Sequence, residues 1–246
     1  MQFQRGSIGL FFRGDPTLKG WWNLGFNSID YTGNGNNGSD TNVLHGRNGF
    51  NPNIYGAYFN GSSSVVTVPN NASLNPGTGP FSISVWVMLF TTNTVAPIFD
   101  KHNAVTFPYT GYVILLHSIS PNIYFSVNDT AKTYGITSNT VIVPYKWYHI
   151  VGVRNGTSGY LYINGQLDNS GTVGGGSVDT TLNLIFGKYS NYNTFTNGII
   201  SEAAFFSRAL SPQEISQYYK WATGVAKKNY TFESIELPQP NFFPFF

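Results

Sequence analysis

The chain has 246 residues, of which 41% are hydrophobic, a length that suits one large domain. Charged residues make up only 10%, the net charge is +2, and no run of Lys or Arg occurs, so we expect no nucleic-acid partner. Without cysteine, the chain has no disulfide framework, no Cys-based zinc site and no thiol nucleophile. We identify neither a signal peptide nor a transmembrane helix, and expect no membrane insertion.

The first 19 residues differ from the strand-rich sequence that follows, and we predict that residues 1–19 form an N-terminal arm. This arm carries a short apolar patch, IGLFF, which ends with Phe11 and Phe12. The tripeptide Arg13-Gly14-Asp15 comes next and is familiar as an integrin motif. We interpret it as a turn before Pro16, since nothing else in the sequence indicates an animal cell-surface protein.

Strand signals dominate the middle of the chain, where runs of β-branched and aromatic residues alternate with Gly, Asn and Ser. In the run 81–87, the odd-numbered apolar residues share one face, whereas Trp86 lies on the other, as in a sheet with one side on a core. Asn164–Gly165 predicts a tight hairpin with a type I′ turn. The main predicted strands are 63–69, 81–90, 111–119, 122–127, 147–154, 182–188 and 198–206.

One helix is predicted, over residues 211–224. Ser211 can cap it, Pro212 suits its first position, Glu214 completes a capping box, and Gly224 can end it. The apolar face expected to pack on the sheets comprises Ile215, Tyr218, Tyr219 and Ala222.

Five motifs occur in a familiar order, and through them residues 20–224 resemble the laminin-G-like, concanavalin A-like jelly rolls. They are WWNLGFNSIDYTGNGNNGS, AYFNGSSSVVTVPNNASLNPGTG, FSISVWV, WYHIVGVRNGTSGYLYINGQL and NGIISEAAFFSRALSPQEI. The resemblance implies an all-β, two-sheet antiparallel sandwich with one short C-terminal helix. It also implies a binding or adhesive role, toward glycans or proteins, sometimes with calcium at the loop rim. Ser201 departs from the acidic residue usual in the family's closing strand.

Some concanavalin A-like relatives hydrolyse β-glucans, and that chemistry needs paired carboxylates. Glu202 is the one glutamate on a predicted strand of the sandwich, and it has no acidic partner two residues away. The four histidines are far apart in the sequence, and we interpret His149 as a packed, hydrogen-bonded strand residue. We therefore expect no enzymatic activity.

Two loops offer aromatic rings beside amide groups, a combination that suits carbohydrate. Asp100 is the candidate calcium ligand, and no other cofactor is expected. The candidate glycan-binding residues are Tyr189, Asn191, Tyr192 and Asn193 in residues 187–198, and Phe107 and Tyr109 in residues 103–112.

Residues 225–246 form a predicted tail rich in Phe and Pro, and exposed apolar stretches of this kind mark interaction sites. With the N-terminal arm, the tail suggests a virion component, such as a phage capsid decoration or a tail or fibre protein. Its partners would be neighbouring virion subunits or further copies of the chain. The alternative is a carbohydrate-binding module, with or without assistance from calcium, that is extracellular or at a surface and contacts surface glycans. The assembly-arm residues are Phe11, Phe12, Phe242, Phe243, Phe245 and Phe246.

Overall fold

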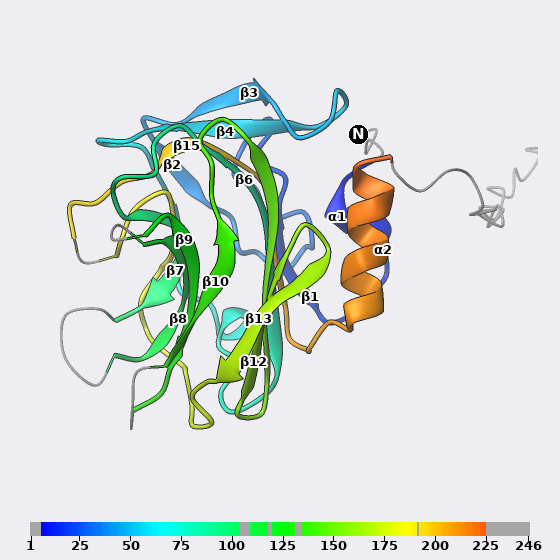
Figure 1. Ribbon diagram of the computed structural model, residues 1–246, viewed down its shortest axis with the longest axis vertical. Helices are drawn as coiled ribbons and strands as arrows, with labels where there is room; N and C mark the ends of the chain where they lie inside the picture. Colours follow the sequence, from blue (N-terminus) through cyan, green and yellow to red (C-terminus); the bar gives the residue numbers. More distant parts are fainter. Residues whose placement is uncertain (1–5, 104–108, 118–119, 131–133, 191, 225–246) are drawn as a thin grey trace, which may run out of the picture.

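Two antiparallel sheets pack face to face in the computed structural model, and one substantial helix lies beside them (Figure 1). The structure describes residues 6–103, 109–117, 120–130, 134–190 and 192–224. The predicted all-β sandwich with a late helix is therefore confirmed. The predicted tail, with Phe242, Phe243, Phe245 and Phe246, lies outside the described residues.

The larger sheet has the strand order β13-β12-β11-β6-β15-β4-β3, and β1 pairs with β15. A bulge between Ser201 and Ala204 interrupts the pairing of β15 with β6. The strands of the larger sheet are β1 (Leu18–Trp22), β3 (Leu44–Asn48), β4 (Tyr55–Asn60), β6 (Phe81–Leu89), β11 (Trp147–Asn155), β12 (Ser158–Ile163), β13 (Gln166–Thr172) and β15 (Asn197–Phe206).

The smaller sheet has the strand order β10-β9-β8-β7-β14-β5-β2. Because β14 pairs with β7 through Ile185 and Asp100, the loop that follows β14 begins beside the end of β7. Its strands are β2 (Ser39–Thr41), β5 (Val65–Val68), β7 (Ala96–His102), β8 (Gly111–Leu116), β9 (Asn122–Asn128), β10 (Gly135–Val141) and β14 (Leu184–Phe186). A short 3-10 turn, η1 (Ala72–Leu74), follows β5.

The hydrophobic core lies between the sheets and is rich in aromatic rings. Phe81 of the larger sheet packs 5.0 Å from the ring of Tyr112 and 5.7 Å from that of Phe205, measured between ring centroids. The odd-numbered residues of β6 face this core, as the alternation of the sequence predicted.

A second apolar cluster covers the outer face of the larger sheet, beneath α1 (Ile8–Phe11) and α2 (Pro212–Ala222) (Figure 1). Trp86, on the outward side of β6, is only 2% exposed. The ring of Phe50 stacks on that of Trp86 with the centroids 3.7 Å apart. The Trp86 indole N–H donates to the Tyr218 hydroxyl at 3.1 Å. This face of the sheet is thus apolar and buried, which the alternation in β6 alone did not indicate.

The N-terminal segment contributes to that second cluster. Phe12 is 7% exposed, and its ring lies 4.9 Å from that of Phe206, while the ring of Phe11 lies 5.6 Å from that of Tyr218. Residues 6–19 of the predicted N-terminal arm therefore pack against the sandwich of their own chain. Phe12 is a buried member of the cluster, and the half-buried Phe11 packs against it.

Local signals at the helix and the hairpin are confirmed. Ser211 accepts from the Glu214 backbone N–H and Glu214 reaches back to the cap, so that the capping box is complete. Asn164 and Gly165 have φ of 53° and 77°, which a type I′ turn requires.

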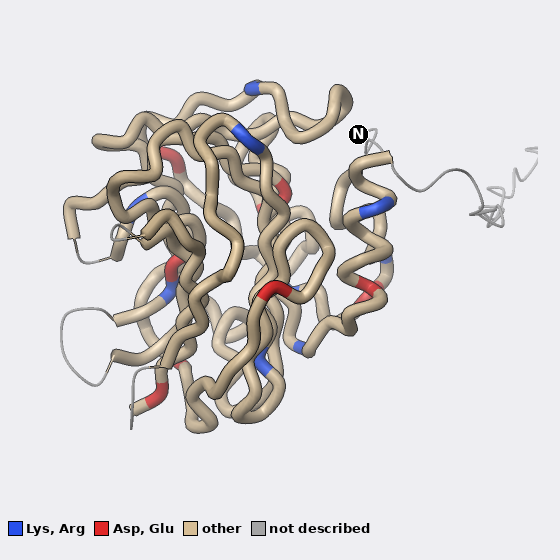
Figure 2. Tube along the Cα trace, viewed as in Figure 1, with Lys and Arg blue, Asp and Glu red and all other residues tan. Residues whose placement is uncertain are grey.

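In the view of Figure 2, the charged positions of the described residues are few and scattered over the fold, and Lys and Arg form no cluster. In the part of the chain that the structure describes, no helix is both long and apolar enough to cross a membrane.

Candidate functional site

The structure brings several of the sequence-predicted site residues together on the outer face of the smaller sheet. Asp100 and His102 alternate along β7 with the core residue Phe99, so they point away from the interior. The loop after β14 places Tyr189 and Ser190 against them. Phe107 and Asn191 lie outside the described residues.

Asp100 is fully buried, and N–H groups hold both of its carboxylate oxygens. One oxygen accepts from the His102 backbone N–H at 3.1 Å and lies 2.6 Å from His102 Nδ1. The other accepts from the Ser190 backbone N–H at 2.7 Å. The carboxylate thereby ties the end of β7 to the loop after β14.

The imidazole of His102 connects Asp100 to Tyr189 through its two ring nitrogens. Since Asp100 is an acceptor, it fixes the imidazole proton on Nδ1, which leaves Nε2 of the neutral ring as an acceptor. Nε2 lies 3.2 Å from the Tyr189 hydroxyl, which donates to it in this tautomer. Ser190 Oγ also donates to the His102 carbonyl at 2.8 Å. A continuous chain of hydrogen bonds thus runs from Asp100 through His102 to Tyr189.

Tyr189 and Tyr192 form a pair of rings at the outer end of this chain. Their centroids lie 5.3 Å apart with the planes tilted by 49°, and Tyr192 is 51% exposed. Burial raises the pKa of the Tyr189 phenol, and the neighbouring charge of Asp100 adds to the effect, so Tyr189 stays a neutral hydrogen-bond donor. Electrostatic coupling to the phenols of Tyr192, Tyr124 and Tyr109 raises the pKa of Tyr189 further, so these residues belong to the same neighbourhood. Asn193 is exposed beside the pair.

The geometry of Asp100 differs from that of a calcium ligand. Calcium takes six to eight oxygen ligands, typically from several carboxylates. The oxygens of Asp100 accept from N–H groups instead, and the described residues contain no group of three or more His, Asp or Glu side chains that could hold a metal. In this structure Asp100 orients His102.

Sequence reasoning named Asp100, Tyr189 and Tyr192 but missed His102 and Ser190. The pattern Asp-x-His on one strand places both side chains on one face, which was the available signal. The tyrosine that completes the chain stands 87 positions away in the sequence from His102, so only the fold could reveal the contact.

Glu202 and His149 are buried titratable residues outside this site. Glu202 has a φ of 49° and is fully buried, and burial raises its pKa to about 7 although N–H donors from Ile8, Trp21 and Asn23 oppose the shift. Burial lowers the pKa of His149 to about 3, and its Nε2 lies 2.9 Å from the Ser84 hydroxyl. His149 is thus a packed, hydrogen-bonded strand residue, as predicted.

Comparison with solved structures shows the same fold in bacterial binding domains. The binding domain of Paraclostridial Mosquitocidal Protein 1 is 20% identical with a TM-score of 0.67, and the match covers 83% of this chain and 52% of that one. The receptor-binding domain of botulinum neurotoxin D is 18% identical with a TM-score of 0.64, again over 83% and 52%. This chain therefore spans about half the length of those toxin domains.

Domain 4 of AbnA, a GH43 extracellular arabinanase from Geobacillus stearothermophilus, was solved in complex with arabinotriose. It is 20% identical with a TM-score of 0.63, and the match covers 82% of this chain and 98% of that one. Among curated protein sequences, a search returned no match. The family model for the concanavalin A-like lectin/glucanases superfamily matches residues 60–216, well over half of the sequence. The chain therefore belongs to the concanavalin A-like lectin/glucanases superfamily.

Proposed function

We propose that this chain is a non-catalytic carbohydrate-binding module whose binding surface is the pair of rings formed by Tyr189 and Tyr192. The observation that carries the proposal is the hydrogen-bond chain from buried Asp100 through His102 to the Tyr189 hydroxyl. A tyrosine fixed in this way needs no ordering when a ligand arrives, which lowers the entropic cost of binding.

The chemistry of the surface suits a sugar. Aromatic faces pack against the apolar side of a pyranose or furanose ring, while a few polar groups fix its orientation. Tyr192 offers an exposed ring, and Asn193 offers an exposed amide that can both donate and accept. The likeness to the arabinanase domain solved with arabinotriose supports this class of ligand, and the likeness to toxin binding domains supports binding as the general role.

We also propose that the chain binds its ligand without catalysing a reaction. Among the described residues of the sandwich strands, the one glutamate is Glu202, which is enclosed beneath α1 and hydrogen-bonded there. It lies on the larger sheet, whereas the tyrosine pair lies on the smaller one. We further propose an extracellular or surface location, where such glycans occur.

The test is a panel of immobilised oligosaccharides that includes arabinotriose, probed with the full chain and with single variants. We expect Tyr192→Ala to abolish binding of whichever glycan is retained, and Tyr192→Phe to restore it because the ring is kept. Tyr189→Phe keeps its ring but loses the hydrogen bond to His102, and should weaken binding about tenfold, the equivalent of one hydrogen bond. Unchanged binding by Tyr192→Ala would refute the proposed surface.

The virion role stays a prediction that the comparisons do not support, because it depends on a tail outside the described residues and on neighbours in an assembly. Light scattering on the full chain and on a version ending at Leu237 tests it. A multimeric full chain and a folded, monomeric truncation would revive the assembly arm. If both the full chain and the truncation are monomers, the tail is not an assembly arm.

A further inference from the structure

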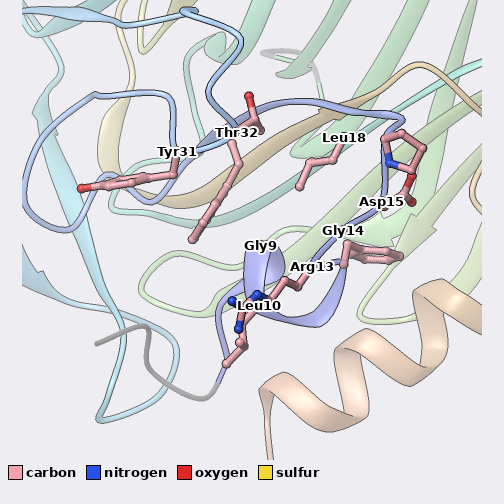
Figure 3. Close-up of a pocket in the computed structure, with 11 residues that line it drawn as sticks. Gly9, Leu10, Arg13, Gly14, Asp15, Leu18, Tyr31 and Thr32 are labelled. Carbon is pink, nitrogen blue, oxygen red and sulfur yellow. The ribbon is translucent and has the colours of Figure 1, made fainter. Parts of the chain in front are cut away.

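A cavity of about 570 Å³ lies beside the N-terminal segment, and Figure 3 shows its lining. The turn after α1 supplies Arg13 and Asp15, β1 supplies Trp21, and the following loop supplies Tyr31 and Thr32. None of the residues of the tyrosine pair or its hydrogen-bond chain lines this cavity. Its volume falls within the range of about 300–1,000 Å³ that is common for small-molecule sites.

The aromatic side of the cavity is formed by Tyr31, which is half-buried, and by Trp21, which is only 4% exposed. Their ring centroids lie 5.3 Å apart with the planes tilted by 47°. The Trp21 indole N–H donates to Glu202 at 3.0 Å, and Gly9 packs so closely that a Cβ there would stand 2.1 Å from the ring. Held from both directions, the indole cannot turn away without moving α1.

The carboxylate that lines the cavity is fully engaged. One oxygen of Asp15 accepts from the Thr17 hydroxyl and N–H at 2.6 and 2.9 Å, and the other pairs with the Arg208 guanidinium at 2.7 Å. Burial disfavours ionisation, but hydrogen bonds from Thr17 and Arg208 hold the pKa of Asp15 below its ordinary value. Asp15 is therefore committed to the fold, which agrees with the reading of Arg13-Gly14-Asp15 as a turn.

Thr32 is engaged as well, since its hydroxyl lies 2.8 and 2.9 Å from the two carboxylate oxygens of Asp30. Arg13 differs from these groups. It is exposed, and in the part of the chain that the structure describes no carboxylate pairs with it. Figure 3 shows Arg13 on the α1 side of the cavity, with Tyr31 and Thr32 across from it.

We propose that this cavity is a second binding site, for a ring that bears a carboxylate, with the carboxylate paired to Arg13 and the ring against Tyr31, which packs beside the buried Trp21. A guanidinium binds a carboxylate through two parallel N–H···O bonds, and aromatic walls accept the apolar face of a ring. Two sources share this chemistry, an acidic sugar unit and a small aromatic acid. The proposal does not depend on the function of the tyrosine pair.

The experiment is titration calorimetry of the full chain at low ionic strength with trigalacturonate, with its neutral counterpart galactotriose, and with benzoate. Arg13→Gln removes the cation at an exposed position, so the fold should be kept. Arg47→Gln, on exposed β3 outside the cavity, is the matched control. Tyr31→Ala removes one aromatic wall.

We expect at least one of the two acids to bind saturably, with Arg13→Gln weakening it about tenfold or more, as expected for a lost charge-assisted hydrogen bond. Arg47→Gln should stay within about twofold of the wild-type affinity, since a distant exposed charge is screened. Tyr31→Ala should also weaken the bound acid. Binding of trigalacturonate alone identifies an acidic saccharide, and binding of benzoate alone identifies an aromatic acid. The proposal is overturned if neither acid binds at millimolar concentration, if galactotriose binds equally well, or if both arginine variants behave alike.

Discussion

The two outer faces of the sandwich each bury a carboxylate that accepts from N–H groups, yet the two carboxylates serve different ends. On the larger sheet, Glu202 accepts from the Ile8 backbone, the Trp21 indole and the Asn23 amide, all beneath or beside α1. On the smaller sheet, Asp100 accepts from His102 and Ser190, and His102 continues to Tyr189.

What lies outside each carboxylate makes the difference. Above Glu202, the segment with α1 and the helix α2 form an apolar layer that seals this carboxylate, while the cavity lined by Trp21 lies beside the layer. Beyond Asp100, the chain of hydrogen bonds reaches a tyrosine next to an exposed ring. A buried acid is thus no sign of a binding site by itself. What indicates a binding site is a chain of hydrogen bonds that connects the buried acid to exposed side chains.

Removal of Phe12 should have the largest effect on the sealed face. Truncation of a buried phenylalanine costs about 3–5 kcal/mol, from lost transfer free energy and the cavity that remains. We therefore expect Phe12→Ala to lower the free energy of unfolding by that amount, measured by urea denaturation. Phe26 is 64% exposed, so Phe26→Ala should change it by less than about 0.5 kcal/mol. Equal, small effects would mean that the N-terminal segment does not seal the face.

Glu202 should make the sealed face sensitive to pH. Its pKa is raised from 4.5 to about 7 by burial, so the folded state favours the protonated carboxyl. The resulting stability is complete below pH 4.5 and is lost as the pH rises through 7, by on the order of 3 kcal/mol. Glu202→Gln, which is neutral throughout, should lose this decline. The unfolding free energy of both proteins from pH 4.5 to pH 8 is the measurement, and parallel curves would contradict the assignment.

The smallest effect is expected at the helix that completes the sealed face. Ser211 caps α2, and Ser211→Ala should cost about 1 kcal/mol because an N-terminal N–H loses its acceptor. Gln217 is an exposed position of the same helix, so Gln217→Ala should change stability by only a few tenths of a kcal/mol. The melting temperatures of both variants check this, and a cap that costs nothing would show that tertiary packing alone holds α2.

Sequence patterns predicted those parts of the fold that local chemistry determines. The capping box at Ser211 and the turn at Asn164–Gly165 depend on neighbours in sequence, and both are present. Helix α1 was missed because four apolar residues carry no helical period, and its stability comes from packing on Trp21 and Tyr218.

Only part of the candidate site was predictable, for the same reason. Aromatic and amide residues in a loop could be recognised from composition, which led to Tyr189 and Tyr192. The role of His102 depends on Asp100 beside it on β7 and on a loop brought near by the pairing of β14 with β7. Long-range pairing of this kind has no local signature.

The most direct test of the difference between the faces is a matched pair of tyrosine variants. Tyr192 is 51% exposed beside the hydrogen-bond chain, while Tyr145 is 71% exposed and stacks on Phe90 of the segment after β6. The measurement is the affinity of wild type, Tyr192→Ala and Tyr145→Ala for the glycan that the oligosaccharide panel selects. Our account predicts loss of binding in Tyr192→Ala and wild-type affinity in Tyr145→Ala. The reverse result, or equal affinity in all three proteins, would contradict it.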